Sequence, residues 1–484
     1  MKPATTIRTA FADKNLLGSI LAGKSWSAWR TLMIAAMGEA LRDDERETFT
    51  RLTGRKREPL ERVEEMAAVV GRRGGKSRAM ATLAVYIAGL CAHPLARGER
   101  GVVLCIAPDQ RQASITLDYA MAAFEASPIL SQLIANRTAD TLELTNGITI
   151  EVRAASFRRL RGPTYIAVIA DEAAFWFSDE FSANADVEIL NAVRPGLSTT
   201  GGPLIIASSP YAKRGVLWDT HRRHYGPDGD PLILVAQGAS REFNPSLPQS
   251  VVDRAMERDR AAASAEYLAE FRADIESFVP YEVIQSCVGD HVEMAPISAH
   301  NYSAFVDPSG GSADSFTLAV SHRDGERVVV DATREVRPSF SPEAVIDDFS
   351  ILLKTYRISK VTGDRYAGEF PRELFRKRGI EYCCAEKPKS DLFRDLLPLL
   401  NSGSIVLPKS ERLVNQLCGL ERRTSRSGKD SIDHGPGGHD DLANAVAGAA
   451  DLISSRAAPM VITRDMIAEI QRAGARRRYL SNFR

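Results

Sequence analysis

A glycine-rich turn between a short apolar run and a helical stretch constrains this chain more than any other feature. The run Met66–Val70 is apolar, and the segment after the turn is rich in alanine. The turn reads Gly71-Arg72-Arg73-Gly74-Gly75-Lys76-Ser77. A glycine turn at a helix N-terminus directs free backbone N–H groups at a phosphate. Lys76 would reach the β- and γ-phosphates of a nucleotide and Ser77 would ligate its Mg²⁺. The usual pattern has its first glycine at position 70, but here Val70 stands there and the glycine is displaced to position 71. The loop is therefore a deviant Walker A. The alternative is a chance glycine-rich turn.

A second apolar run ends in two acids, as the other half of an ATP site requires. Ile166–Ala170 is followed directly by Asp171 and Glu172. Asp171 would hold Mg²⁺ through water, and Glu172 would polarise the water that attacks the γ-phosphate. Taken alone, an acidic pair is also typical of a helix N-terminus. Together with the upstream loop, it predicts ATP hydrolysis.

Small hydroxyls and arginines supply the remaining candidates for this site. The apolar run Leu204–Ala207 leads into Ser208 and Ser209, which can sense a γ-phosphate, although Ser-Ser-Pro also marks an ordinary loop. Arginines neutralise charge in a phosphoryl-transfer transition state. Arg72 lies in the glycine-rich loop and Arg161 lies just before the acidic strand, but single surface arginines are most often only solvated.

The pattern along the chain predicts an α/β protein with two sheets. Between 61 and 240, short apolar runs alternate with helical stretches, which is typical of a parallel sheet covered on both faces. Residues 1–60 read as a helical segment, with Leu16–Leu21 at helical spacing, and 241–295 as a lid or linker with one long helix, Gln249–Ala273. A second α/β region follows at 296–455, and 456–484 is a basic tail. In the second region the expected strands are Ala304–Val306, Thr317–Ser321, Val328–Asp331 and Lys360–Gly363, the first three as a meander, with a closing helix at 441–454.

Length and composition exclude several classes of protein. The 484 residues suggest about two to four domains. The 62 basic and 62 acidic residues cancel, which excludes binding of polyanions through overall charge but not through a local basic groove. None of the six cysteines forms a Cys-x-x-Cys pair, so a zinc knuckle is not expected and the thiols read as reduced, cytosolic cysteines. The uncharged stretch Ala79–Ala96 is too weakly apolar to span a bilayer and reads as a buried helix ending near Cys91, so no membrane association is expected.

A second group of acids lies in the C-terminal half. Asp307 and Asp364 each end an apolar run, and His439-Asp440-Asp441 opens the helical stretch at 441–454. Acids brought together from two strands and a helix are costly unless cations neutralise them. Two Mg²⁺ or Mn²⁺ ions would do so and would support in-line attack on a phosphodiester. Each acid alone also has an ordinary interpretation as a turn, a strand end or an N-cap.

The order of these motifs resembles the large terminase subunit of tailed bacteriophages and prophages, over about residues 50–455. In that resemblance Gly71–Ser77 corresponds to the Walker A with its early arginine Arg72, and Ile166–Glu172 to the Walker B with its catalytic glutamate. Ala207–Ser209 corresponds to the coupling motif and Arg161 to an arginine finger acting on a neighbouring subunit. The acids that match the family's ribonuclease H-like nuclease are Asp307, Asp364 and the Asp440–Asp441 pair, of which Asp441 is the preferred third ligand.

The resemblance implies an N-terminal P-loop ATPase that moves double-stranded DNA into a procapsid, and a nuclease that cuts concatemeric DNA. It also implies a portal protein and a small terminase subunit as partners, a ring that is typically pentameric, and the cytoplasm of a bacterial host. The family's adenine-reading motif is not evident, and the loop Thr53–Pro59 is the candidate replacement. Two alternatives stay open: an ATP-dependent DNA translocase or helicase without nuclease activity, and an ATP-regulated scaffold that binds DNA without cutting.

Overall fold

The computed structural model describes residues 1–156, 160–176, 185–311, 314–364, 370–424, 430–435 and 438–455. They form two compact units. Unit 1 comprises Met1–Ser286 and Ser410–Ala443, and unit 2 comprises Cys287–Lys409 and the chain from Asn444 onward. The division differs from the expected one, because the N-terminal segment, the core and the region after 241 group together and Ser410–Ala443 joins them. The basic tail at 456–484 lies outside the described residues.

Unit 1 is built on an eight-stranded sheet in the order β10-β2-β9-β8-β4-β7-β6-β5. The first six strands of this order are mutually parallel, and β6 and β5 add an antiparallel hairpin at one edge. The expected strands around the glycine-rich loop and the acidic pair are confirmed. The bounds are β2 (Glu65–Val70), β4 (Gly101–Ala107), β5 (Ile134–Arg137), β6 (Thr141–Leu144), β7 (Ile148–Ala154), β8 (Thr164–Asp171), β9 (Leu204–Ser208) and β10 (Ile233–Gly238).

Helices cover both faces of this sheet, which is why its parallel strands read as unbroken apolar runs. Alternate residues of β2 enter two different cores: Ala68 and Val70 pack with one set of helices, Ala67 and Val69 with the other. On the first face lie α4 (Lys76–Leu90) and α5 (Gln110–Glu125), with the short helix η2 (Leu130–Leu133). On the second lie η4 (Ala173–Phe175), α6 (Ala185–Ser198) and α7 (Gly215–His224). The expected buried helix before Cys91 is α4.

The N-terminal segment belongs to the same core and is no separate domain. It contains α1 (Ile7–Ala12), η1 (Lys24–Trp26), α2 (Ser27–Ala36) and α3 (Asp43–Thr53), and the short strands β1 (Lys2–Pro3) and β3 (Cys91–Ala92) pair beside it. Trp29 and Phe49 are fully buried in the core that also holds Val70. The helix expected from the spacing of the apolar residues in Leu16–Leu21 is wrong: Leu16, Leu17, Ile20 and Leu21 are buried, but the backbone forms successive turns.

The long helix expected over Gln249–Ala273 is also wrong. Two helices, α9 (Gln249–Arg258) and α10 (Arg260–Leu268), replace it and follow the short α8 (Ser240–Phe243). The break is Asp259, whose backbone is extended at φ −150°. Its N–H closes α9 on the carbonyl of Ala255, and its side chain accepts the N–H of Ala262 as the N-cap of α10. An aspartate favours this capping role over a helix interior.

A three-stranded antiparallel sheet completes unit 1. Its order is β11-β18-β19, and its strands are β11 (Ile275–Ser277), β18 (Leu420–Thr424) and β19 (Asp430–His434). The helix α15 (Glu411–Gly419) leads into β18, and α11 (Tyr281–Cys287) follows β11. Two segments more than a hundred residues apart in sequence therefore form one sheet.

Unit 2 contains a six-stranded sheet in the order β16-β15-β12-β13-β14-β17. The expected meander is confirmed as β12 (Tyr302–Asp307), β13 (Phe316–Asp324) and β14 (Arg327–Val336), and β15 (Lys360–Gly363) joins β12 in parallel. The edges are β16 (Glu381–Cys384) and β17 (Ile405–Val406), both parallel to their neighbours. A meander whose first strand is extended by two parallel strands is the strand order of the predicted ribonuclease H-like fold.

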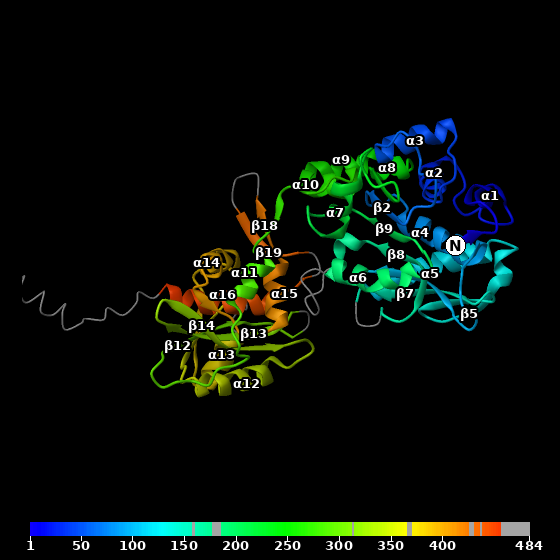
Figure 1. The fold of residues 1–484 in the computed structure, drawn as a ribbon. Helices are drawn as coiled ribbons and strands as arrows, with labels where there is room; N and C mark the ends of the chain where they lie inside the picture. Colours follow the sequence, from blue (N-terminus) through cyan, green and yellow to red (C-terminus); the bar gives the residue numbers. More distant parts are fainter. Residues whose placement is uncertain are drawn as a thin grey trace, which may run out of the picture. The chain divides into compact units, whose positions relative to one another are not determined.

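Helices cover both faces of this sheet as well (Figure 1). The helix α12 (Pro342–Thr355) packs on one face through Phe349, together with Phe375 of α13 (Phe370–Lys377). On the other face lie α14 (Lys389–Asn401) and α16 (Asp441–Ser454), where a Cβ added at Gly448 would lie 2.3 Å from the ring of Phe305. The expected closing helix is therefore confirmed, and its glycine is required for close packing on β12.

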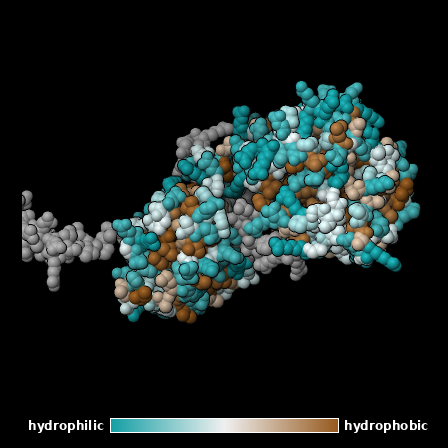
Figure 2. Space-filling view, viewed as in Figure 1, coloured by the Kyte–Doolittle hydropathy of each residue, from teal (hydrophilic) through white to brown (hydrophobic). Residues whose placement is uncertain are grey.

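Among the described residues, none of the helices combines the length and the apolar character needed to cross a membrane. On the face drawn in Figure 2 the surface over α3 is hydrophilic.

Candidate nucleotide and metal sites

The backbone of the glycine-rich loop is shaped by positive φ angles at its end. Gly75 has φ +81°, and a Cβ there would lie 2.7 Å from the ring of Trp26. Arg73 adopts φ +135°, which is strained for a residue with a side chain. Glycine at position 75 therefore satisfies both the backbone conformation and the close approach of the indole. The helix α4 begins at the next residue, so the loop lies at a helix N-terminus as the phosphate-binding interpretation requires.

Side chains from distant parts of unit 1 hold this loop through its carbonyl groups. The Oγ of Ser240 donates to the Arg72 carbonyl at 2.5 Å, and the Nδ2 of Asn244 donates to the Arg73 carbonyl at 3.0 Å. The buried Nε1 of Trp29 donates to the Gly74 carbonyl at 2.6 Å. The sequence analysis missed all three donors. No local pattern could have found them, because each lies far from the loop in sequence.

Lys76 lies at the centre of the site. Its side chain is only 6% exposed. Its Nζ donates to the Ser209 Oγ at 2.8 Å and to the Val70 carbonyl at 3.2 Å, and it lies 3.0 Å from Oε1 of Glu172. The structure thus brings together residues from β2, β8 and β9, which are neighbours in the sheet. An ammonium group at this place is available to the terminal phosphates of a nucleotide bound on the loop.

Ser77 and Asp171 form the part of the site that could hold a metal. The Ser77 Oγ donates to Oδ2 of Asp171 at 3.0 Å. Oδ1 of Asp171 is buried without a hydrogen-bond partner among the described residues. Burial, and then the negative charge of Glu172, raise the pKa of Asp171 to about 6, against the opposing effect of Lys76. A hydroxyl beside a carboxylate with an unused oxygen is a donor set that fits Mg²⁺.

Glu172 is held in a conformation that aims its carboxylate at the sheet edge. Its φ is +50°, in the left-handed region that costs energy for a non-glycine residue. Its Oε2 accepts the N–H of Ser209 at 2.9 Å and the hydroxyl of Ser208 at 3.2 Å. The two serines therefore bind the glutamate and the lysine at once, which links the end of β9 to both partners.

The arginines that the sequence predicts for the nucleotide site lie outside the cluster of Lys76, Asp171 and Glu172. Arg72 forms an ion pair with Glu266 at 2.9 Å, and both side chains are substantially exposed. Arg73 is exposed, and so is Arg161, which lies three residues before β8. In the part of the chain that the structure describes, none of these guanidinium groups contacts Lys76 or Glu172. A role for Arg161 on a neighbouring subunit stays a prediction.

Arg55 has a structural role within the loop Thr53–Pro59. The residue is 7% exposed, and its guanidinium donates to the carbonyls of Gly226, His224, Asp230 and Ile233, at 2.9–3.1 Å. Every one of these acceptors is main chain, so Arg55 ties the loop Thr53–Pro59 to the segment before β10. These contacts use the Nε and Nη2 groups of Arg55, and a base-reading role for the loop Thr53–Pro59 stays a prediction.

In unit 2, Asp307 and Asp364 lie side by side at the ends of parallel strands. Val306 of β12 is in register with Gly363 of β15, so the two acids that follow leave the same edge of the sheet. The buried Asn444 of α16 donates its Nδ2 to Oδ2 of Asp307 at 2.7 Å. The sequence analysis missed this amide, although it lies three residues after Asp441 on the same helix.

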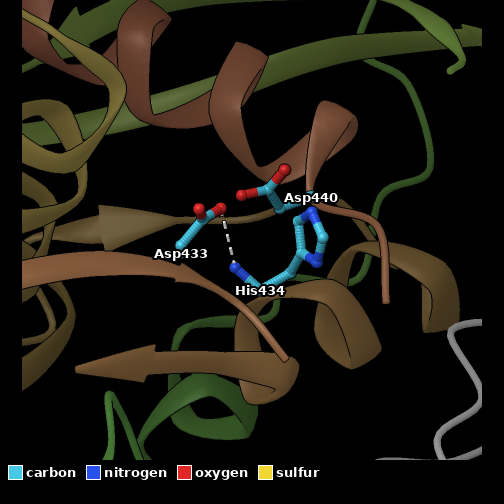
Figure 3. A group of neighbouring side chains, drawn as sticks. All are labelled: Asp433, His434 and Asp440. Atoms are coloured by element: carbon cyan, nitrogen blue, oxygen red, sulfur yellow. Dashed lines mark hydrogen bonds between the residues drawn. The ribbon is translucent and has the colours of Figure 1, made fainter. Parts of the chain in front are cut away.

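The acids near the start of α16 have a histidine beside them. Asp433, His434 and Asp440 each offer a ligand atom, and these atoms all lie within 4.8 Å of one another (Figure 3). The N–H of His434 donates to Oδ1 of Asp433 at 3.0 Å. The ring Nδ1 of His434 lies 2.8 Å from the Gly435 carbonyl. This favours the tautomer with the proton on Nδ1, which leaves Nε2 free to be the metal ligand. Two carboxylates and an imidazole fit a divalent cation.

Of these three residues the sequence predicts only Asp440 as a main site residue, and it does not indicate His434. Asp433 and His434 are the last two residues of β19 and Asp440 directly precedes α16, and spacing alone does not reveal that they lie together. Asp441 is the first residue of α16, and Asp440 is 4% exposed.

No family model matches the sequence, and no curated protein matches it. Solved structures that resemble it include the large terminase of bacteriophage HK97, which is 14% identical, with 81% of this chain and 91% of that chain covered and a TM-score of 0.36. The large terminase of a thermophilic bacteriophage, in complex with ADP, is 14% identical, with 81% and 94% covered and a TM-score of 0.36. The large terminase nuclease of the thermophilic phage G20c with bound magnesium is 18% identical over 36% of this chain and 96% of that chain, with a TM-score of 0.32. At such scores the likeness carries no argument about function, which has to come from the site residues.

Proposed function

We propose that this chain is a large terminase subunit, an ATP-driven motor that moves double-stranded DNA into a procapsid and cuts it with a metal-dependent nuclease. One observation carries the proposal: a phosphate-loop site with Lys76, Asp171 and Glu172 in unit 1 occurs in the same chain as the strand-end acids Asp307 and Asp364 in unit 2. Either half alone occurs in many kinds of enzyme. The combination fits a protein that both moves and cleaves DNA.

In the ATPase half, the backbone N–H groups of Gly71–Ser77 bind the phosphates and Lys76 binds the terminal ones. Ser77 and Asp171 hold Mg²⁺, which neutralises the phosphate charge when it is bound. Glu172 orients the attacking water and accepts its proton. The ion pair of Glu172 with Lys76 at 3.0 Å supports this assignment, because it places the base next to the group that binds the γ-phosphate. Ser208 and Ser209 sense the γ-phosphate, and Arg72 and Arg161 neutralise its charge, Arg161 from a neighbouring subunit.

In the nuclease half, Asp307, Asp364 and the Asp440–Asp441 pair hold two Mg²⁺ or Mn²⁺ ions, with Asp441 as the preferred third ligand. Bound ions of this kind supply charge stabilisation on both sides of a phosphodiester. Asn444 orients the Asp307 carboxylate through its 2.7 Å hydrogen bond. Asp441 and Asn444 are three residues apart on α16 and so share one face of the helix, which supports Asp441 as the third acid.

The remaining parts of the proposal concern assembly. The chain would act as a homo-oligomeric ring, of five copies in the family it resembles, on a portal protein, with DNA supplied by a small terminase subunit in the cytoplasm of a bacterial host. The equal numbers of acidic and basic residues suit a motor that slides along DNA and grips it only locally. The exposed basic residues of α13, such as Arg372 and Lys377, are candidates for such a local grip.

The helicase alternative is disfavoured by the topology of unit 2. A second motor domain would have a parallel sheet with its own phosphate loop or arginines. The sheet of unit 2 instead begins with the antiparallel meander of β12, β13 and β14, and carries acids at its strand ends. A scaffold without catalysis is disfavoured by the strained backbone of Glu172, which has no evident structural purpose.

Plasmid cleavage by the purified full chain in Mg²⁺ or Mn²⁺ tests the proposal, with ATP hydrolysis measured in parallel. We expect the wild type to cut, Asp307→Asn to lose cleavage and keep ATP hydrolysis, and Lys76→Ala to show the reverse. Two independent losses would establish two separate sites in one chain. Cleavage that survives Asp307→Asn, or hydrolysis that survives Lys76→Ala, would contradict the assignment of the corresponding site.

A further inference from the structure

A buried glutamate links the two functional regions of unit 1. Glu421 of β18 has no exposed surface. Its carboxylate accepts the hydroxyl of Tyr211 at 2.7 Å, a guanidinium N–H of Arg214 at 2.5 Å and one of Arg423 at 3.1 Å. Hydrogen bonds to a fully buried charge are strong, and removing one partner leaves that charge uncompensated. Tyr211 and Arg214 therefore fix the position of β18 relative to the segment that follows β9, and Arg423 adds a donor from β18 itself.

Two routes connect Tyr211 with the nucleotide site. Along the chain, Tyr211 is separated from Ser209 only by Pro210, whose ring restricts the backbone. Ser209 contacts Lys76 through its hydroxyl and Glu172 through its N–H. In space, the ring of Tyr211 lies 5.5 Å from that of Phe175, the last residue of the short helix η4 that follows Glu172.

A bound nucleotide would change the contacts of Lys76, Ser209 and Glu172, from which both routes start. A γ-phosphate on the loop competes for the Nζ of Lys76, which then exchanges its contacts with Ser209 and Glu172 for phosphate oxygens. Ser209 loses the partner that holds its side chain. Because interiors are close-packed, the shift passes to the next rigid neighbours, Pro210 and Tyr211, and is not absorbed between them.

On its other side Glu421 meets the acidic group at the start of α16. In the pairing of β18 with β19, Glu421 lies directly opposite Asp433, and Leu420 lies opposite His434. Asp433 and His434 belong to the group whose ligand atoms lie within 4.8 Å of one another (Figure 3). A Cβ added at Gly435 would lie 2.7 Å from Oε1 of Glu421, so the backbone of Gly435, the residue after His434, passes close to the glutamate.

We infer that Glu421 is a positioning residue that couples occupancy of the nucleotide site to the placement of Asp433, His434 and Asp440. Tyr211 carries the displacement to Glu421, and the β18–β19 pair carries it to the metal-binding side chains. Cleavage of DNA therefore depends on the nucleotide bound to the same chain. The inference rests on the proposed function, since it requires an ATP site and a nuclease site.

The test is the ratio of plasmid cleavage rates with and without a non-hydrolysable ATP analogue, measured on the full chain. Coupling between two sites commonly amounts to about 5–150-fold, and we expect the wild-type ratio to fall in that range. Tyr211→Phe removes one hydroxyl, and Glu421→Gln keeps the shape but removes the charge. In both variants the ratio should lie within about twofold of one. ATP hydrolysis should be retained, and so should the cleavage of DNA in the absence of nucleotide.

A matched control lies in the same hairpin. The Nε of Arg422 donates to Oδ2 of Asp430 at 2.7 Å across the strands, and its side chain is half-exposed. Arg422→Gln weakens the hairpin without touching Tyr211 or Glu421. It should keep the wild-type ratio, so that a change confined to Tyr211→Phe and Glu421→Gln separates coupling from simple loosening of the hairpin.

Hydrogen exchange of the β18 and β19 amides gives a readout that does not depend on cleavage. The nucleotide analogue should change their exchange in the wild type and in Arg422→Gln, but not in Tyr211→Phe. The inference is overturned if these amides do not respond in the wild type, or if Tyr211→Phe and Glu421→Gln respond as the wild type does. A response of the amides in a protein that cuts no DNA would instead contradict the proposed nuclease and leave the coupling standing.

Discussion

The Nζ of Lys76 lies 3.0 Å from Oε1 of Glu172, so the lysine proposed to bind phosphate and the glutamate proposed as the general base form an ion pair with each other. The lysine is almost fully buried and the glutamate is 23% exposed. A nucleotide has to replace this pair with its own phosphates. The same exchange frees Glu172 to bind water, so binding and activation of the base follow from one rearrangement.

The first prediction concerns the two members of this pair. Lys76→Ala should abolish nucleotide binding, since it removes the only cation found within the cluster in the described part of the chain. Glu172→Gln should retain binding, measured by titration calorimetry with ATP, but should lower kcat of ATP hydrolysis by about 10²–10⁴-fold, the usual effect of losing a general base. Lys213→Ala is the matched control, because Lys213 is an exposed lysine over the ring of Trp218.

This control should hydrolyse ATP like the wild type. If Glu172→Gln lost binding as completely as Lys76→Ala, Glu172 would be a structural partner of the lysine and no base.

The second prediction concerns the pH dependence of stability. The pKa of Asp171 is raised to about 6 from its ordinary 3.8 by burial and by Glu172. The folded state therefore favours the protonated acid, and the resulting stability is fully present below about pH 3.8 and lost as the pH rises through 6. Above pH 6 the ionised carboxylate costs at most about 3 kcal/mol. In EDTA, Asp171→Asn should be more stable than the wild type at pH 8, and this advantage should shrink toward pH 4.

Tryptophan fluorescence during denaturation in urea measures this difference. All four tryptophans lie in unit 1, which makes the signal specific to the unit that contains Asp171. An advantage that was the same at pH 8 and pH 4 would show that Asp171 does not titrate in this range. Mg²⁺ with ATP should stabilise the wild type at pH 8 but not the variant.

The third prediction concerns Arg55. Arg55→Met keeps an unbranched apolar stem but leaves the four carbonyls of Gly226, His224, Asp230 and Ile233 without their donor. Buried acceptors without a donor are costly, so unfolding of unit 1 should become easier by about 2–4 kcal/mol. The ratio of ATP to GTP hydrolysis at a permissive temperature should not change. A variant of normal stability that no longer distinguished the two nucleotides would restore the base-reading role.

The fourth prediction concerns the amide beside the nuclease acids. Asn444→Ala removes the 2.7 Å hydrogen bond that orients Asp307. Groups behind a metal ligand commonly contribute about 10–100-fold in metal affinity, so cleavage should require about tenfold more Mg²⁺ and recover at high concentration. Ser321→Ala is the control, because the Ser321 hydroxyl binds the carbonyl of Ala449 on the same helix without touching Asp307.

The metal dependence of plasmid cleavage distinguishes the two variants. An equal loss in Ser321→Ala and Asn444→Ala would indicate that only the packing of α16 matters. A loss in Asn444→Ala that no concentration of metal restores would place the amide in the reaction itself.

The sequence alone predicted the strands before the glycine-rich loop and the acidic pair and the meander of unit 2, because these depend on local order. A buried parallel strand has to be apolar along its length, as Ile166–Ala170 is, and a loop that binds phosphate has to consist of residues with free backbone N–H groups. Where local order was ambiguous the prediction failed: Asp259 reads as a helix residue within Gln249–Ala273, but its side chain caps a new helix.

Only the tertiary structure decided how the sites are held and connected. Ser240, Asn244 and Trp29 bind carbonyls of a loop from which they are distant in sequence, and Glu421 meets Tyr211 across 210 positions. The four main-chain carbonyls that Arg55 binds are likewise far from it in sequence. Such contacts depend on which segments the two sheets bring together, and hydrophobic periodicity carries no information about the pairing of polar groups between distant segments.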